Sequence, residues 1–115
     1  MIIVRITMNV FPEKRKEVVQ TLLSMTETAE KEKGCTSYEA FYDIEDKTVF
    51  NLIEEWENRD DLEHHIRSER FSVLLGTKSL LAKPLDINIY TVSHSEGLDA
   101  VNKLRGKGKY KKISK

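Results

Sequence analysis

The spacing of apolar residues changes along the first 94 residues, and the order of these spacings limits the possible folds. Residues 2–11 alternate with a period of two, which is typical of a strand. From residue 13 the period lengthens to that of a helix, with one apolar stripe formed by Val18, Leu22, Met25 and Ala29. Gly34 then occupies the position where a left-handed residue usually closes a helix. The chain therefore opens with a strand and a helix.

The same succession of periods follows a second time, with an extra strand. Residues 36–46 alternate, an aspartate-rich turn follows, and residues 49–57 alternate again, which predicts a hairpin. Asn58 is a suitable N-cap for a second helix, and Ser68 can start an offset helical segment. Residues 85–94 form the predicted last strand. The order β-α-β-β-α-β predicts an α+β, ferredoxin-like fold, with helices on one face of an antiparallel sheet.

The other face of the predicted sheet also carries large apolar residues. An antiparallel sheet that is open to water on one side is normally polar there. The chain has too few helices to cover both faces. We therefore expect a second copy to cover the open face, sheet on sheet, in a two-fold homodimer.

Charge divides the chain into a domain, residues 1–94, and a basic tail, residues 95–115. The domain holds 17 acidic and 12 basic residues, a net charge of −5, and the tail holds two acidic and seven basic residues, a net charge of +5. The tail has little to bury, so we expect it to be flexible or bound to a partner. Its charge could support contact with nucleic acid, but Tyr110 is its only aromatic residue, which argues against such contact.

Neither a membrane segment nor a disulfide is expected. No apolar run approaches the roughly 18 residues of a membrane span, and no small-residue cleavage site follows the apolar N-terminus. The single cysteine, Cys35, excludes an internal disulfide and is expected to pack rather than to act as a nucleophile. We expect a cytoplasmic protein without membrane contact.

His65 is the candidate catalytic base. It shares a helical face with Leu62 and Ile66, so it should point inward, and an imidazole titrates near neutral pH. The alternative is a buried histidine whose ring is satisfied by a backbone carbonyl. His64 lies on a different helical face, so the two histidines cannot hold one metal ion from a regular helix, and we expect no metal site.

Glu54 is the candidate acid that orients His65 or accepts a proton. It shares a strand face with Leu52 and Trp56, where a carboxylate is costly unless it is paired. The alternative is a salt bridge to Arg5 across the sheet. Six residues are candidates for substrate contact, although each could simply pack in the fold: Trp56, Tyr38, Tyr42, Asn9, Phe71 and Leu75.

These residues occur in a combination that resembles the antibiotic biosynthesis monooxygenase superfamily of small, dimeric α+β barrels. The resemblance covers about residues 1–93 and rests on the following pattern: Gly34-Cys35, Tyr38, Asp43, Glu54-x-Trp56 and His65-x-x-Ser68-x-x-Phe71. It implies a homodimer with one pocket per subunit between sheet and helices. Characterised members of this superfamily include oxygenases that act on quinols or anthrones without flavin, haem or metal. The resemblance therefore implies that this chain uses no cofactor and that its substrates are a small aromatic or quinoid molecule and dioxygen.

The leading hypothesis is thus a cofactor-independent monooxygenase in which a His65/Glu54 dyad abstracts a proton. The resemblance leaves other functions open. Some relatives isomerise a phosphorylated signalling furanone, which would require a cationic phosphate contact. A haem-degrading branch uses an asparagine, a tryptophan and a histidine, a set that Asn9, Trp56 and His65 could imitate. A non-catalytic ligand-binding or stress module is the remaining alternative.

Overall fold

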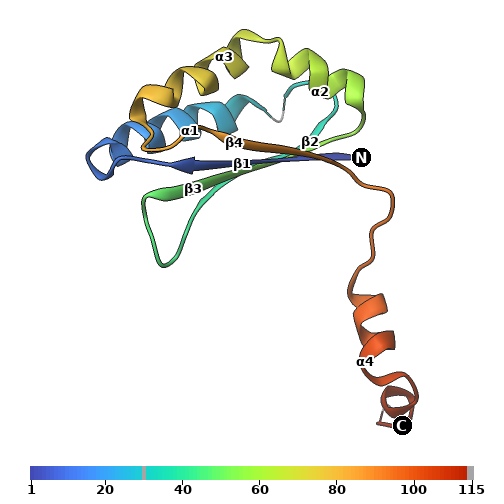
Figure 1. Cartoon of the computed structure of the whole chain (residues 1–115). Helices are drawn as coiled ribbons and strands as arrows, with labels where there is room; N and C mark the ends of the chain where they lie inside the picture. The colour runs from blue at the N-terminus through green and yellow to red at the C-terminus, as the bar shows by residue number, and fades with distance from the viewer. Residues whose placement is uncertain (30, 114–115) are drawn as a thin grey trace.

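The computed structural model describes residues 1–29 and 31–113. Four antiparallel strands form one sheet, and three helices cover one of its faces (Figure 1). The elements in chain order are β1 (Ile2–Asn9), a 3₁₀ turn (Pro12–Lys14), α1 (Arg15–Ala29), β2 (Cys35–Tyr42), β3 (Val49–Trp56), α2 (Arg59–Ile66), α3 (Glu69–Gly76), a second 3₁₀ turn (Thr77–Leu80), β4 (Asp86–Thr91) and α4 (Leu98–Ile113).

The strand order is β2-β3-β1-β4, which confirms the predicted ferredoxin-like α+β fold. Strand β1 lies in the centre and pairs with β3 on one side and β4 on the other. The predicted hairpin pairs β2 with β3 and sets Tyr38 opposite Glu54. Glu54 in turn lies opposite Val4 of β1. This register places the acid in the middle of the sheet's width, on the face that the helices cover.

Side-chain caps start both parts of the second helical region, as the sequence predicts. The Asn58 side chain accepts a hydrogen bond from the backbone N–H of Asp61 at 2.9 Å, and the Ser68 hydroxyl accepts one from the N–H of Phe71 at 3.3 Å. Such caps satisfy amide groups that a helix leaves unpaired at its N-terminus. Helix α2 ends at Ile66, and α3 begins at Glu69 with a cap of its own.

Gly34 has a φ of 81°, so the predicted left-handed conformation is confirmed. Helix α1 itself ends earlier, at Ala29. A Cβ atom at position 34 would overlap the carboxylate of Asp61. The carbonyl oxygen of Gly34 also accepts a hydrogen bond from the N–H of Glu57 at 2.8 Å. Only glycine combines this backbone conformation with so close an approach, and the turn after α1 therefore packs tightly against the start of α2.

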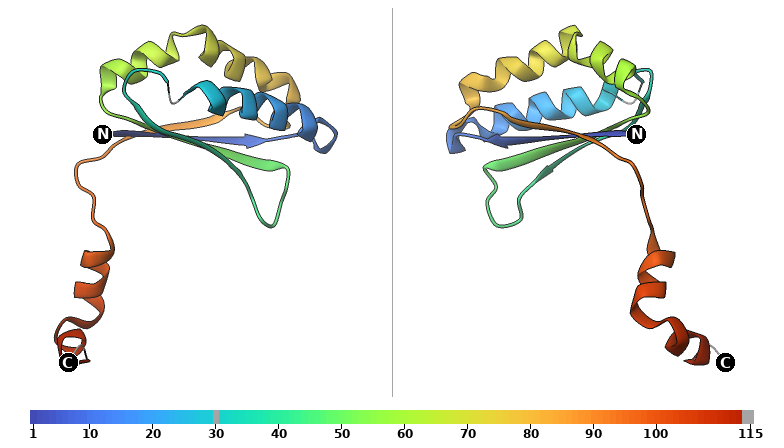
Figure 2. Two further views of the ribbon diagram at one scale, coloured as in Figure 1. Left: turned by 180° about the vertical axis from the view of Figure 1, so that it is seen from behind. Right: turned by 45° about the vertical axis from the view of Figure 1, so that its right-hand side comes forward.

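The helix-facing side of the sheet forms the core, and the opposite side is open (Figure 2). The predicted apolar stripe of α1 is buried against the sheet. Apolar side chains also occupy the open face: Ile3 and Ile53 are half-buried there, and Phe41 and Tyr90 are 47% and 50% exposed. This observation agrees with the pattern from which a covered second face was predicted.

Helix α4 was not predicted from the sequence. It follows β4 after a short extended segment and stands away from the layers of sheet and helices (Figure 1). Three apolar side chains of its first turns are exposed: Leu98, Val101 and Leu104. None of the described helices is long and apolar enough to cross a lipid bilayer.

Candidate functional site

His65 lies inside the fold, where α2 crosses the sheet, and it is 1% exposed. Its side chain projects from the buried face of α2, which it shares with Leu62. Three aromatic rings surround the imidazole. Its centroid lies 4.6 Å from that of Trp56, 5.6 Å from that of Phe71 and 6.0 Å from that of Tyr38. The predicted inward orientation is confirmed.

Glu54 lies beside this ring at the end of β3 and is fully buried. Its Oε1 accepts a hydrogen bond from Nε1 of Trp56 at 2.9 Å, and the same oxygen lies 3.7 Å from Nε2 of His65. A salt bridge with Arg5 is excluded by the register, because Arg5 pairs with Ile53 and points to the open face. The carboxyl group of Glu54 thus lies between an indole and an imidazole.

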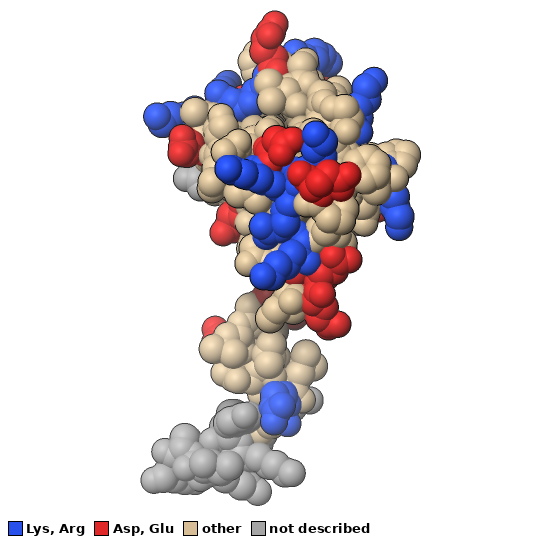
Figure 3. Space-filling model, turned by 90° about the vertical axis from the view of Figure 1, so that its left-hand side faces the viewer, with Lys and Arg blue, Asp and Glu red and all other residues tan. Residues whose placement is uncertain are grey.

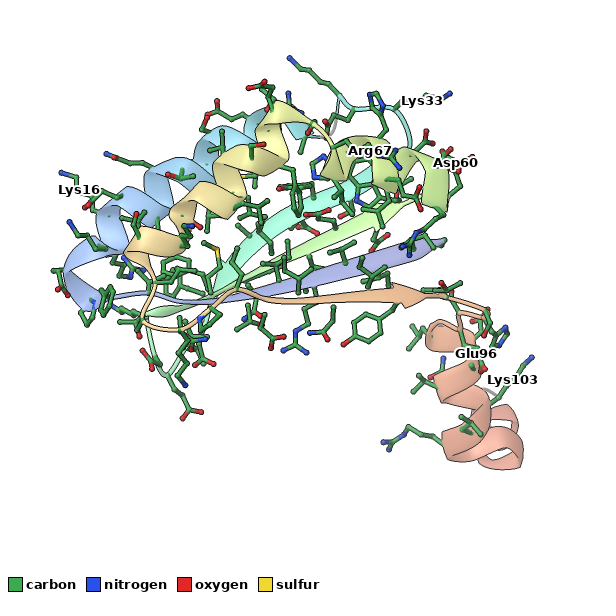
Figure 4. The ribbon with its side chains drawn as sticks, turned by 45° about the horizontal axis from the view of Figure 1, so that its top comes forward. Lys16, Lys33, Asp60, Arg67, Glu96 and Lys103 are labelled. Carbon is green, nitrogen blue, oxygen red and sulfur yellow. The ribbon has the colours of Figure 1, made fainter. Side chains whose placement is uncertain are left out.

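The second imidazole nitrogen contacts a residue that the sequence analysis did not single out. Nδ1 of His65 lies 2.6 Å from Oε2 of Glu32, and Oε1 of Glu32 lies 3.1 Å from a guanidinium nitrogen of Arg70. Glu32 belongs to the turn after α1, which also contains Gly34 and packs against the start of α2. Figure 4 shows the turn, marked by Lys33, at the same end of the fold as α2, marked by Asp60 and Arg67. Glu32 and His65 are 33 residues apart, so no local pattern could indicate the contact.

Burial shifts the proton affinities of this cluster. It raises the pKa of Glu54 to about 7, although the hydrogen bond from Trp56 acts in the opposite direction. Burial lowers the pKa of His65 below its ordinary value and outweighs Glu32, whose charge and hydrogen bond act to raise it. Burial and the nearby carboxylates of Glu54 and Glu32 raise the pKa of Tyr38. Near pH 7, the site therefore combines a neutral imidazole with an acid that can take up or release a proton.

Four buried polar atoms of this cluster lack a hydrogen-bond partner among the described residues: Tyr38 Oη, Glu54 Oε2, His65 Nε2 and Nη1 of Arg70. Unpaired polar atoms in a buried place are costly, so such a cluster usually has a partner or a functional reason. The imidazole can accept a proton, and the carboxyl and phenol groups can donate hydrogen bonds to a developing oxyanion. The aromatic walls suit a flat guest molecule.

The structure brings together five of the predicted residues and leaves three apart. The five are His65, Glu54, Trp56, Tyr38 and Phe71. The other three lie elsewhere: Asn9 is on the open face at the far end of β1, opposite Val49, Tyr42 is 52% exposed, and Leu75 is 48% exposed. Asn9 thus does not join Trp56 and His65 in the set of the haem-degrading branch. The proposed substrate contacts of these three residues stay predictions.

Tyr42 instead lines a surface groove of about 380 Å³ between α1 and the β2–β3 hairpin. The guanidinium of Arg15 lies 4.8 Å from the centroid of the Tyr42 ring at this groove.

No group of three or more His, Cys, Asp and Glu side chains in residues 1–29 and 31–113 is placed to hold a metal ion.

Comparison with known proteins supports a family assignment. Residues 1–74 match the model of the antibiotic biosynthesis monooxygenase family. An uncharacterized protein of Synechocystis is 31% identical over 98 residues, which cover 84% of this chain and 67% of that protein. A Bacillus subtilis protein named "Putative monooxygenase YcnE" is 27% identical over 88 residues, which cover 76% of this chain and 93% of that protein.

Solved structures show the same fold. A crystal structure named as a putative antibiotic biosynthesis monooxygenase, from Deinococcus radiodurans, superposes with a TM-score of 0.79 at 21% identity, and the match covers 85% of this chain and 98% of that chain. A conserved protein of Methanosarcina mazei superposes with a TM-score of 0.73 at 33% identity, and this match covers 77% of this chain and 89% of that chain.

Proposed function

We propose a monooxygenase-like function for this chain, which belongs to the antibiotic biosynthesis monooxygenase family. A monooxygenase-like function is supported at the level of the family and its relatives. The finer proposal is a cofactor-independent monooxygenase that acts on a quinol- or anthrone-like substrate. One observation carries it: the imidazole of His65 and the carboxyl group of Glu54 lie 3.7 Å apart, buried among aromatic rings.

In the proposed reaction, His65 takes a hydroxyl proton from the bound quinol. The deprotonated ring is electron-rich enough to reduce dioxygen itself, so the step needs no flavin, haem or metal. One oxygen atom enters the ring and the other leaves as water, so that a quinol becomes a hydroxyquinone. In this proposal Glu54 and Tyr38, each with a buried polar atom that has no hydrogen-bond partner among the described residues, stabilise the negative charge on the substrate oxygen and return a proton.

Substrate entry requires a local opening of the fold, because the side chains of the site are almost fully buried. Tyr38, Glu54, Trp56 and His65 are at most 2% exposed in the single chain. Glu32 and Arg70 are 20% and 32% exposed, so they form the rim nearest to solvent. We propose that the guest molecule enters past this rim and displaces side chains from the Nε2 side of the imidazole, while Glu32 keeps its contact with Nδ1. Loops that open in this way are common at active sites.

The proposal is tested by oxygen uptake with menadiol. Purified protein should consume one dioxygen per menadiol, at a rate at least about 100-fold above the autoxidation of menadiol, because a positioned base contributes about 10²–10⁴-fold. The product should have gained one oxygen atom by mass spectrometry. A rate equal to autoxidation would contradict the proposal. Conversion of a phosphorylated furanone without oxygen, followed by nuclear magnetic resonance, would instead support the isomerase alternative.

We also propose that the active form is a homodimer joined through the open face of the sheet. The apolar residues of that face are the supporting observation, because monomers rarely leave such a surface in water. Sedimentation should give a mass twice the 13.4 kDa of the chain, and Tyr90→Lys should shift the mass toward that of the monomer. A wild-type mass of one chain at micromolar concentration would refute the dimer.

A further inference from the structure

The two ring nitrogens of His65 have different surroundings. Nδ1 lies 2.6 Å from Oε2 of Glu32, which is hydrogen-bond distance. Nε2 lies 3.7 Å from Oε1 of Glu54, which is too long for a hydrogen bond, and it has no hydrogen-bond partner in residues 1–29 and 31–113. The nitrogen that faces Glu54 is therefore the one available to a guest molecule.

The contact with Glu32 determines which nitrogen carries the proton in the neutral ring. A carboxylate oxygen accepts hydrogen bonds, and Arg70 lies 3.1 Å from the other oxygen of Glu32. Nδ1 must then donate, and Nε2 is left with a lone pair. The hydrogen bond at one imidazole nitrogen generally decides whether the other nitrogen carries a proton.

The backbone holds Glu32 in place for this contact. Its N–H donates to the carbonyl of Ala29 at 3.0 Å, and its carbonyl accepts from the N–H of Cys35 at 3.1 Å. Gly34 completes the turn and lies directly against the first turn of α2. The carboxylate and the imidazole are therefore carried by two segments that pack together, so their distance is set by the fold rather than by flexible side chains alone.

We propose that Glu32 is a positioning residue that holds His65 with its proton on Nδ1, so that Nε2 is the atom that removes the substrate proton. This inference rests on the proposed monooxygenase-like function of the site. It divides the two acids by role: Glu32 orients the base from behind, and Glu54 faces the guest molecule on the opposite side. Arg70 in turn holds the carboxylate of Glu32.

The ionisable groups that face His65 come from four segments. They are Glu32 of the turn, Tyr38 of β2, Glu54 of β3 and Arg70 of α3. Glu32 raises the proton affinity of the imidazole, and burial and the charge of Arg70 lower it. Removing the charge of Glu32 should thus lower the pKa of His65 further and make the ring a weaker base.

The test is ¹⁵N nuclear magnetic resonance of the imidazole in the full chain, with Glu32→Gln as the variant and Glu63→Gln as the control. Glu63 also pairs with arginines but lies on the outer side of α2, at 3.0 Å from Arg59 and 3.3 Å from Arg67. The wild type and the control should carry the proton on Nδ1. Glu32→Gln should shift part of the population to Nε2, lower the pKa of His65, and reduce kcat for menadiol about tenfold or more.

The tautomer and the activity decide separate questions. A wild-type spectrum with the proton on Nε2 would overturn the role of Glu32, and so would a Glu32→Gln spectrum that equals the control. The wild-type spectrum decides even if the variant does not fold. If the spectra behave as expected but the wild type does not oxidise menadiol, the positioning contact stands and the proposed function fails. Glu32→Asp should recover part of both effects, since it keeps the carboxylate.

Discussion

Replacing Glu54 by glutamine is expected to remove a loss of stability that the wild-type protein suffers as the pH rises. The pKa of Glu54 is raised by burial to about 7 in the folded chain, whereas an unfolded glutamate titrates near pH 4.3. Between these values the folded state holds a proton that the unfolded state has released. The free energy of unfolding therefore falls from about pH 4.5 to pH 7, by on the order of 3 kcal/mol.

Glutamine cannot ionise, and its carbonyl oxygen can still accept the hydrogen bond from Trp56. At pH 8 Glu54→Gln should be more stable than the wild type, and the advantage should vanish near pH 4.5. His65 has the opposite trend, because its lowered pKa makes stability rise with pH up to about 6.5. Both proteins contain His65, so its contribution cancels when the free energy of unfolding of the wild type is subtracted from that of Glu54→Gln.

Urea unfolding at several pH values measures this difference. Glu57→Gln is a matched control at the same end of β3, because Glu57 is exposed. Its stability should run parallel to that of the wild type at every pH. If Glu54→Gln also runs parallel to the wild type, Glu54 is ionised at the same pH in the folded and unfolded states, and the description of a protonatable buried acid is wrong.

Much of the fold could be predicted because its signals are local. The alternation of residues 2–11 and 49–57, the apolar stripe of α1, and the caps Asn58 and Ser68 each lie within a few neighbouring residues. Such signals survive in the fold because burial and capping act on single elements. Helix α4 carried no comparable signal, since its apolar and basic residues do not gather on one face.

The site was harder to predict, because it depends on distances between elements. Tyr38 and Tyr42 share a strand face, but four residues of strand separate them by about 13 Å, and only the register shows that Tyr38 lies opposite Glu54. Leu75 follows Phe71 along α3, yet it points outward while Phe71 is buried. Glu32 reaches His65 only because the chain turns at Gly34.

The distribution of charge on the folded surface was also hard to predict from the sequence. The domain is acidic and the tail is basic, and opposite net charges attract each other. Basic and acidic side chains are nevertheless intermixed over the end of the domain seen in Figure 3, so that face offers the tail no purely acidic surface. Net charge predicts long-range attraction, but it does not say where charges gather on the folded surface.

His65→Ala is expected to have the largest effect on activity, because it removes the proposed base. Oxygen uptake with menadiol should fall at least about 100-fold, and added imidazole should restore part of the rate by occupying the vacated space. His64→Ala is the matched control, since His64 directly precedes His65 in α2 and is exposed. Circular dichroism would show that both variants keep the fold.

The central claim is that the imidazole of His65, held inside the fold beside Glu54, takes a proton from the guest molecule. The most direct test compares the oxygen uptake of His65→Ala and His64→Ala at pH 7 with saturating menadiol. We predict that His64→Ala keeps the wild-type rate within about twofold, and that His65→Ala falls to near autoxidation. Equal rates in the two variants would contradict the claim.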